Sequence, residues 1–309
     1  MNKKVAILIN SCDLYEDVWN PFFSLFKTQW PDCPYDIYLN TENKTYVCDF
    51  LDVKTITTGN EKPWTMRIKK ALDEIESDYI LFTLEDFFLL NRVDETKFSD
   101  IISEMQNKRE VGFVFFTPLG VKYDIDYKPD TLFSDVSKYA DYRVNACLGL
   151  WKKEFLLQML YLDGSPWEFE HNATRLSWLS KHRCCVINPD YSSIFSYSIL
   201  PSEGYGITQR KWLPKNKELF DKYNIQVNFS TLGFIEKKSD SLNKTKQSEK
   251  AKIKTSQKHF STFRRKIQKH KKRIKKQIRY FNDLLFLKPK FIAYCNDISK
   301  SGPPAKPEA

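Results

Sequence analysis

The sequence predicts an α/β protein with an open, mostly parallel β-sheet, and two observations lead to this fold class. Short apolar segments, typical of buried strands, alternate with segments in which apolar residues recur every three or four positions, as in amphipathic helices. The first 236 residues are also rich in Phe, Tyr and Trp, and the whole chain has only 9 glycines. This part of the chain can therefore bury a large core, and its alternating pattern favours strands covered by helices.

The expected elements follow one another along this body. The first strand is Val5 to Asn10, and the helix after it contains Pro21. In a later helix, Trp64, Ile68 and Leu72 form one apolar stripe. The full set comprises strands at 5–10, 35–40, 53–58, 79–83, 111–116 and 144–151, and helices at 14–30, 64–77, 152–161 and 167–181.

Charge divides the chain into two unlike parts. The formal net charge is +10, yet residues 237–300 hold 21 Lys and Arg against 4 Asp and Glu, and residues 1–236 hold 27 against 34. An acidic body is therefore joined to a very basic tail, and each part needs its own explanation. We expect a globular domain at 1–236, a polar basic linker at 237–258, a basic amphipathic helical tail at 259–300 and a disordered end at 301–309.

Polar residues follow several of the expected strands. In open α/β sheets, ligands bind outside the carboxyl ends of the strands, near the point where the strand order reverses. Glu85 and Asp86 follow a buried strand and precede an apolar run, so either could ligate Mg²⁺ or Mn²⁺. The alternative is a helix or turn cap. The candidate strand-end residues are Ser11, Cys12, Asp13, Asn40, Thr41, Glu85 and Asp86.

A second group of carboxylates lies in Ser165-Pro-Trp-Glu168-Phe-Glu170-His171. Two residues apart on a helix, Glu168 and Glu170 diverge by about 200° and cannot both face one site. Ser165 and Glu168 also fit a capping box with Pro166 at the first helical position, which is a complete structural explanation for Glu168. A carboxylate at a helix start beside a cleft is, alternatively, suited to act as a general base for a hydroxyl group.

Two basic groups beside aromatic residues lie within the acidic body. Arg67 follows Trp64, and Arg210 and Lys211 precede Trp212. They could bind a diphosphate, or they could belong to an ordinary solvated face. The sequence lacks the glycine-rich motifs of dinucleotide and nucleoside-triphosphate sites, the G-x-S-x-G hydrolase motif and the H-E-x-x-H zinc motif.

Taken in order, these pieces resemble a bacterial glycosyltransferase of the GT-A fold, of the kind found in capsule, lipopolysaccharide or teichoic-acid biosynthesis. The resemblance covers about residues 4–225 and implies a Rossmann-like open mixed sheet flanked by helices. It rests on Ser11-Cys12-Asp13, on Trp64-Thr-Met-Arg67, on Thr83-Leu-Glu85-Asp86-Phe87-Phe88, on Gly149-Leu-Trp-Lys-Lys-Glu-Phe155 and on Pro166-Trp-Glu-Phe-Glu170.

The resemblance implies that a sugar moves from a nucleotide-sugar, expected to be a UDP-sugar, to a hydroxyl of a glycan or lipid-linked glycan. It implies inversion at the anomeric carbon, with Glu168 or Glu170 as the catalytic general base. Because Leu84-Glu85-Asp86 stands where the family has Asp-x-Asp, both a Mn²⁺ or Mg²⁺ cofactor held by Asp86 and Glu85 and metal-independent transfer remain open. The implied nucleotide-sugar-binding residues are Ser11, Cys12, Asp13, Asn40, Arg67, Glu85, Asp86, Arg210 and Lys211.

The tail indicates where such an enzyme would work. Apolar residues recur at three- and four-residue spacing from Phe260 to Leu285, with Lys and Arg between them. This pattern favours contact of residues 259–287 with an anionic membrane surface. No apolar run reaches the length of a membrane span, and we expect a cytoplasmic protein, peripheral on the inner face of the bacterial cell membrane. The alternative function is a non-catalytic nucleic-acid-binding protein that uses the basic tail.

Overall fold

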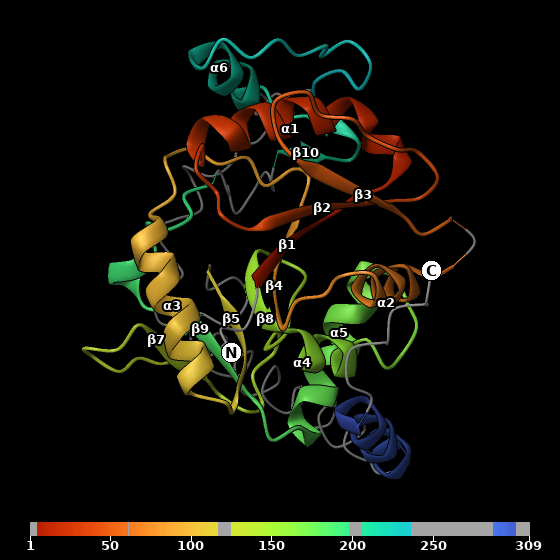
Figure 1. Ribbon diagram of the computed structural model, residues 1–309, viewed down its shortest axis with the longest axis vertical. Helices are drawn as coiled ribbons and strands as arrows, with labels where there is room; N and C mark the ends of the chain where they lie inside the picture. Colours follow the sequence, from red (N-terminus) through yellow and green to blue (C-terminus); the bar gives the residue numbers. More distant parts are fainter. Residues whose placement is uncertain (1–4, 61, 117–124, 198–205, 236–286, 301–309) are drawn as a thin grey trace, which may run out of the picture. The chain divides into compact units, whose positions relative to one another are not determined.

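The chain is described by a computed structural model that covers residues 5–60, 62–116, 125–197, 206–235 and 287–300. Within these ranges, nine strands form one sheet in the order β3-β2-β1-β4-β8-β5-β9-β7-β6, and a separate hairpin pairs β10 with β11 (Figure 1). The strands of the large sheet are β1 (Val5–Asn10), β2 (Asp36–Thr41), β3 (Val53–Thr57), β4 (Tyr79–Leu84), β5 (Val111–Phe115), β6 (Ile125–Asp126), β7 (Phe133–Val136), β8 (Gly149–Lys152) and β9 (Arg183–Ile187).

The sheet is mixed, which confirms the predicted fold class. Strands β3, β2, β1 and β4 are parallel, whereas β8 is antiparallel to both of its neighbours, β4 and β5. The expectation of a mostly parallel sheet therefore holds for β3, β2, β1 and β4, whereas among the other described strands only β5 and β9 form a parallel pair. Gly149 allows β8 to enter the centre of the sheet, because a Cβ there would lie 2.3 Å from the ring of Phe113.

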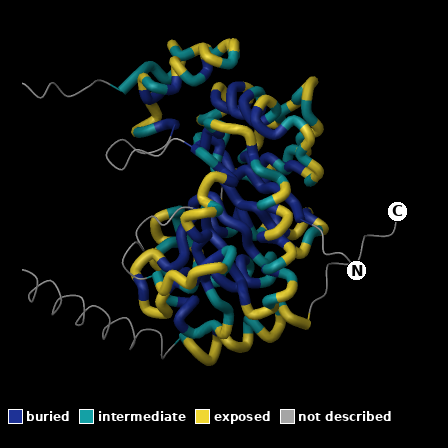
Figure 2. Tube along the Cα trace, turned by 90° about the vertical axis from the view of Figure 1, so that its left-hand side faces the viewer, coloured by how far each residue is buried: buried dark blue, intermediate teal, exposed yellow. Residues whose placement is uncertain are grey.

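Helices cover both faces of the sheet. One core cluster joins alternate residues of β1 and β4, among them Ile7 and Leu81, to α1 (Glu16–Gln29) and α3 (Glu95–Asn107). The other joins the intervening residues, such as Leu8 and Ile80, to α2 (Trp64–Asp73), α4 (Lys153–Met159) and α5 (Pro166–Leu179). Successive side chains of a strand point to opposite faces of the sheet, so these strands contribute to two apolar cores. The buried strands form the dark blue centre in Figure 2.

Most expected elements are present with shorter bounds. The first helix begins as a short 3-10 turn, Asp13–Tyr15, and continues as α1 through Pro21. The second expected helix ends at Asp73 instead of residue 77. Of the expected strand at 144–151, only the part from Gly149 onward forms a strand, which is β8 (Gly149–Lys152). Residues 143–146 run beside α5 and form hydrogen bonds to that helix instead.

The last described residues return to the body. Residues 287–300 are helical, and within 291–300 the Phe291 side chain is 2% exposed and belongs to the core cluster of α4 and α5. The Tyr294 hydroxyl donates to the Leu157 carbonyl at 3.1 Å, and the Ser299 hydroxyl donates to Glu154 at 2.9 Å. The end of the predicted tail is therefore attached to the domain.

The rest of the predicted tail lies outside the described residues. This applies to the linker at 237–258, to the basic amphipathic helix from 259 to 286 and to the end at 301–309. The membrane-binding and nucleic-acid-binding hypotheses for that segment stay predictions. In the part of the chain that is described, no helix is both long and apolar enough to cross a bilayer.

Candidate functional site

The strand order of the sheet reverses beside β1. The chain passes from β1 outward to β2 and β3, and then crosses back to place β4 on the other side of β1. Asn10 and Leu84 are register partners at the carboxyl ends of β1 and β4. The next residues, Ser11 and Glu85, therefore leave the sheet side by side, at the position where ligands bind in open α/β sheets.

A buried arginine connects the ends of three parallel strands at this edge. Arg67, in the first turns of α2, is 5% exposed. Its Nη2 donates to the Ser11 carbonyl at 2.9 Å, and its Nε donates to Thr58 Oγ1 at 3.2 Å. Its Nη1 lies 3.4 Å from Glu42 Oε1. The guanidinium therefore holds the segments that follow β1, β2 and β3.

Polar side chains behind Arg67 complete this network. The Thr58 hydroxyl donates to Asn40 Oδ1 at 2.9 Å and lies 2.9 Å from the Thr41 carbonyl. Asn40 Nδ2 donates to Asn10 Oδ1 at 2.7 Å. Asn10, Asn40 and Thr58 are all buried. Hydrogen bonds compensate for burying these polar groups, so they form a rigid floor under the site.

Asp13 holds the loop after β2. Its carboxylate accepts hydrogen bonds from the backbone N–H groups of Glu42, Asn43 and Lys44 at 3.0 to 3.3 Å. In return, Glu42 Oε2 accepts from the Asp13 N–H at 3.1 Å. The Asp13 carboxylate is thus occupied by backbone groups, and it joins the end of β1 to the end of β2.

Glu85 and Asp86 form a carboxylate pair beside Ser11. Glu85 is 7% exposed, and Asp86 is half-buried. Burial raises the pKa of the Glu85 carboxyl, and the charge of Asp86 raises it further, while Ser11 and Arg67 act in the opposite direction. Burial also raises the pKa of Asp86, and the Ile207 N–H opposes this. Two adjacent carboxylates with little water around them favour a nearby cation.

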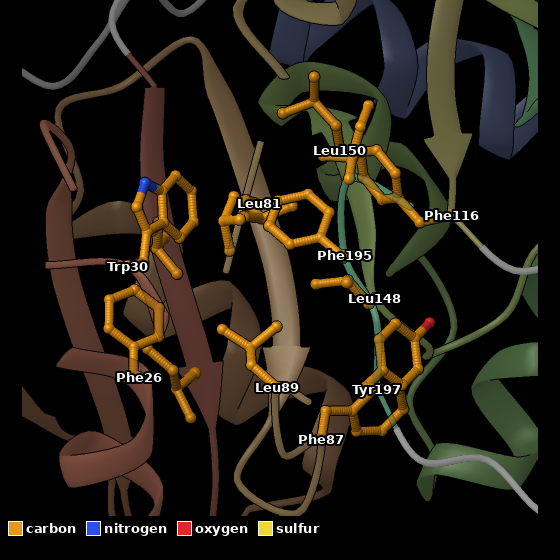
Figure 3. Close-up of a cluster of buried hydrophobic side chains, with 14 of the residues drawn as sticks. Phe26, Trp30, Leu81, Phe87, Leu89, Phe116, Leu148, Leu150, Phe195 and Tyr197 are labelled. Carbon is orange, nitrogen blue, oxygen red and sulfur yellow. The ribbon is translucent and has the colours of Figure 1, made fainter. Parts of the chain in front are cut away.

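Apolar residues on the C-terminal side hold the pair in place. Phe87 and Leu89 point into the core cluster beside Tyr197 (Figure 3). The Phe87 and Tyr197 rings are 5.1 Å apart, Leu89 pairs with Tyr197 in an isolated antiparallel bridge, and the Leu90 N–H donates to the Ser196 carbonyl at 2.7 Å. The backbone after β4 is therefore fixed, and so is the position of both carboxylates.

A small hairpin carries basic residues toward this pair. It consists of β10 (Ile207–Thr208) and β11 (Lys211–Trp212). The Ile207 N–H lies 3.3 Å from Asp86 Oδ2, and the Gly206 N–H donates to the Asp86 carbonyl at 3.0 Å. A Cβ on Gly206 would lie 2.7 Å from that carbonyl, so only glycine allows this approach.

The hairpin turn exposes Arg210. Gln209 and Arg210 both have positive φ, 52° and 60°, as in a two-residue type I′ turn. Arg210 and Lys211 are both exposed. Burial and the charge of Glu85 raise the pKa of the Tyr15 phenol, whereas the charge of Arg210 lowers it. Arg210 is thus within electrostatic reach of the same space as the carboxylates.

The second predicted group of carboxylates lies at the start of α5. The Thr65 N–H donates to the Gly164 carbonyl at 3.2 Å, and the Gly164 N–H donates to Thr65 Oγ1 at 2.9 Å. The start of α5 is therefore bound to the start of α2, which also carries Arg67. This places Glu168 and Glu170 at the same edge of the sheet as Glu85.

The two glutamates have different surroundings. Glu168 completes the capping box predicted for it and accepts from the Ser165 N–H at 2.8 Å. It is exposed, and the Ser165 backbone and hydroxyl hydrogen bonds lower its pKa. Glu170 is half-buried, and Oε1 accepts from the Ala146 N–H at 3.0 Å. Burial raises the pKa of Glu170, while the Ala146 N–H opposes the rise.

The predicted strand-end residues lie together in the structure, but several of them already form hydrogen bonds within the protein. This applies to Arg67, Asn40 and Asp13. Cys12 is a thiol at neutral pH, because burial and the charge of Glu85 raise its pKa to about 11. Sequence reasoning missed Thr58, Glu42 and Tyr15. Thr58 ends an expected strand and could have been found by the same strand-end rule, whereas Glu42 and Tyr15 follow from contacts between distant segments.

Comparisons with known proteins give matches among solved structures only. No protein-family model and no curated protein sequence matches the chain. TarS of S. aureus is 12% identical, with a TM-score of 0.42 over 60% of this chain and 35% of TarS. TarS 1–349 in complex with UDP is 13% identical, with a TM-score of 0.41 over 60% of this chain and 58% of that one. The mannosyltransferase PcManGT of Pyrobaculum calidifontis, in complex with GDP-Man and Mn²⁺, is 13% identical, with a TM-score of 0.40 over 61% of this chain and 55% of that one. The chain spans less than two thirds of each of these proteins.

We expect Arg67→Met to lower the free energy of unfolding by about 2 kcal/mol, because it leaves the buried acceptors of Arg67 without a donor. We expect Arg67→Lys to recover little of this free energy of unfolding, since an ammonium group cannot reproduce the planar arrangement of donors in a guanidinium. Lys70→Met on the same helix is the control, because Lys70 is exposed, and its effect should stay within about 0.5 kcal/mol. Urea unfolding of the three variants measures this. Equal effects at the two positions would contradict the bridging role of Arg67.

Proposed function

We propose that this chain is a glycosyltransferase of the GT-A type that uses a nucleotide-sugar donor, a UDP-sugar in the first instance. The observation that carries the proposal is the carboxylate pair at the reversal of strand order. Glu85 and Asp86 leave β4 beside Ser11 of β1, and a hairpin with Arg210 and Lys211 bonds to Asp86. An anionic diphosphate fits between these groups when a cation balances the carboxylates.

The donor would lie across the ends of β1 and β4. Ser11 and Cys12 would line the nucleoside side of the site, over the residues Asn40 and Asp13. Arg67 acts as a positioning residue, because its nitrogens already bond to Ser11, Thr58 and Glu42. Arg210 and Lys211, which are exposed, approach the diphosphate from the hairpin.

The carboxylate pair fits a divalent cation, which the donor would help to hold. Among the described residues, no group of three or more His, Cys, Asp or Glu side chains could hold a metal alone. Mg²⁺ and Mn²⁺ in such enzymes need only one or two carboxylates, because the phosphates and water complete the shell. Asp86 and Glu85 would hold the ion. A bound ion supplies positive charge to the diphosphate as it leaves.

Glu170 is the better of the two candidates for the general base. A base must attract a proton at neutral pH, and burial raises the pKa of Glu170. Glu168 is already bonded to Ser165, and these bonds lower its pKa. In the proposed step, the Glu170 carboxylate accepts the proton of the acceptor hydroxyl. That oxygen bonds to the anomeric carbon as the bond from this carbon to the diphosphate breaks, which inverts the configuration.

The acceptor and the setting belong to the same proposal. A hydroxyl of a glycan or of a lipid-linked glycan is the proposed acceptor, as in bacterial capsule, lipopolysaccharide or teichoic-acid assembly. The support is the sequence of residues 259–286, whose basic amphipathic pattern suits the inner face of an anionic membrane. At that surface, the active site would meet acceptors that are anchored in lipid.

We expect Asp86→Asn and Arg210→Asn each to weaken UDP binding about tenfold in the presence of Mn²⁺, a loss of about 1.4 kcal/mol. Asparagine suits position 210, because it tolerates the positive φ there. Asp100→Asn on the exposed side of α3 is the matched control. Calorimetric titration of UDP, with and without MnCl₂, measures the effects. Mn²⁺ should raise the affinity of the wild type and of Arg210→Asn, but not of Asp86→Asn. Identical affinities in all the proteins would contradict the proposed site.

We expect Glu170→Gln to lower the rate of UDP-sugar hydrolysis, in which water replaces the acceptor, by about 10²- to 10⁴-fold, with UDP affinity unchanged. Glu168→Gln should remain active and folded, since Gln also completes a capping box. The wild-type rate should fall on the acid side with an apparent pKa above the ordinary 4.5 of a Glu, because the base must lose its proton first. The part of this acid limb that is due to Glu170 should be absent in Glu170→Gln, whereas the part due to protonation of Glu85 and Asp86 should remain. A panel of UDP-sugars is assayed against pH, and loss of activity in Glu168→Gln alone would reverse the assignment.

A further inference from the structure

An open cavity of about 720 Å³ lies at the edge of the sheet opposite the proposed donor site. It is formed where β7 and α5 end and where β9 begins, and its lining includes Lys138, Arg143, Lys181 and Arg183. Since β9 is parallel to β5, which runs in the same direction as β4, its first residue lies at the edge where β4 begins. The cavity is within the size range of small-ligand sites.

Arg143 is a buried cation that forms no ion pair with another described residue. It is 5% exposed, and it donates from Nη1 to the Ser177 carbonyl at 3.1 Å and from Nη2 to the His182 carbonyl at 3.4 Å. Its Nε is buried and has no hydrogen-bond partner among the described residues. Carbonyl groups accept hydrogen bonds but do not neutralise the positive charge. A buried charge without a counter-ion is costly, so this guanidinium favours an anion.

The other charges of the lining do not supply that anion. Asp135 accepts from Arg183 Nε at 2.7 Å and from Nη2 at 2.8 Å, and Lys128 lies 3.4 Å away. This carboxylate is therefore already balanced by its own cations. Among the described residues of the lining, Arg143 remains with the exposed Lys138 and Lys181, against the carboxylate of Asp126. The remaining charge of these described residues is positive.

The surrounding groups suit a tetrahedral oxyanion. Ser137, Ser180 and His182 also line the cavity. Burial and the charge of Lys152 lower the pKa of His182, which favours the uncharged ring, and its Nδ1 lies 3.3 Å from Ser180 Oγ. Guanidinium and ammonium groups with hydroxyls around them are the usual partners of phosphate. We propose that this cavity is a second anion site, which binds a phosphate group, either free or as part of a phosphodiester.

The site is independent of the proposed donor site and would persist if that proposal failed. The test is a titration of inorganic phosphate into the full chain, followed by calorimetry and ³¹P NMR, in the presence of excess UDP to occupy any diphosphate site. Dimethyl phosphate is titrated in parallel. Stronger binding of inorganic phosphate indicates a free phosphate or monoester, and stronger binding of the dimethyl ester indicates a phosphodiester.

We expect the double variant Lys138→Ala/Lys181→Ala to bind phosphate about tenfold more weakly than the wild type, since it lacks two exposed cations of the lining. Its affinity for UDP and its thermal midpoint without phosphate should be unchanged.

Lys217→Ala is the matched control, because Lys217 is an exposed lysine of α6 (Lys215–Lys222) that is not part of the cavity. Arg143→Lys, which keeps the charge, should reduce phosphate binding but retain the fold. The proposal is overturned if the wild type shows no saturable binding at millimolar phosphate, or if the double variant binds as well as Lys217→Ala.

Discussion

The arrangement of the proposed donor site depends on the hydrogen bonds of one buried side chain, Arg67. Parallel strands do not define where the segments after them go, and here the guanidinium fixes the segments after β1, β2 and β3 together. Ser11, which it holds through its carbonyl, leaves the sheet beside Glu85. The guanidinium is already engaged by Ser11, Thr58 and Glu42. In the proposed function, the positive charge for an anionic ligand therefore comes from the hairpin with Arg210 and from a metal ion.

Helix α5 links the two proposed sites physically. Its start bonds to the start of α2, at the edge that carries the strand ends, and its end lines the cavity at the opposite edge. Residues 143–146 run antiparallel beside it: Arg143 bonds to the Ser177 carbonyl, Val144 bonds to Thr174, and Ala146 bonds to Glu170. An anion that held Arg143 would therefore steady the segment that also supports Glu170. At 14 residues, the helix separates its two ends by about 20 Å.

Local patterns in the sequence predicted the elements of the first half of the sheet, and the strand-end rule then selected residues that do lie together. The capping box of Ser165 and Glu168 was also predictable, because both of its partners are close in sequence. The antiparallel insertion of β8 was not, since it depends on the fit of Gly149 against Phe113. Helix α3 was missed although Phe98, Ile101, Ile102 and Met105 have helical spacing, whereas strand β9 is a short apolar run and helix α6 has too few apolar residues to show a period. The internal use of Arg67 and the contact of Ile207 with Asp86 depend on distant segments, which no local pattern reveals.

We propose that a nucleoside diphosphate binds where strand order reverses, between the ends of β1 and β4. A crystal structure of the full chain with UDP and Mn²⁺ would locate the bound diphosphate. We expect the diphosphate to lie beside Asp86 and the hairpin that carries Arg210, with the uridine over Ser11 and Cys12. A diphosphate bound in the cavity of Arg143 instead, with nothing beside Glu85 and Asp86, would contradict the assignment of the donor site.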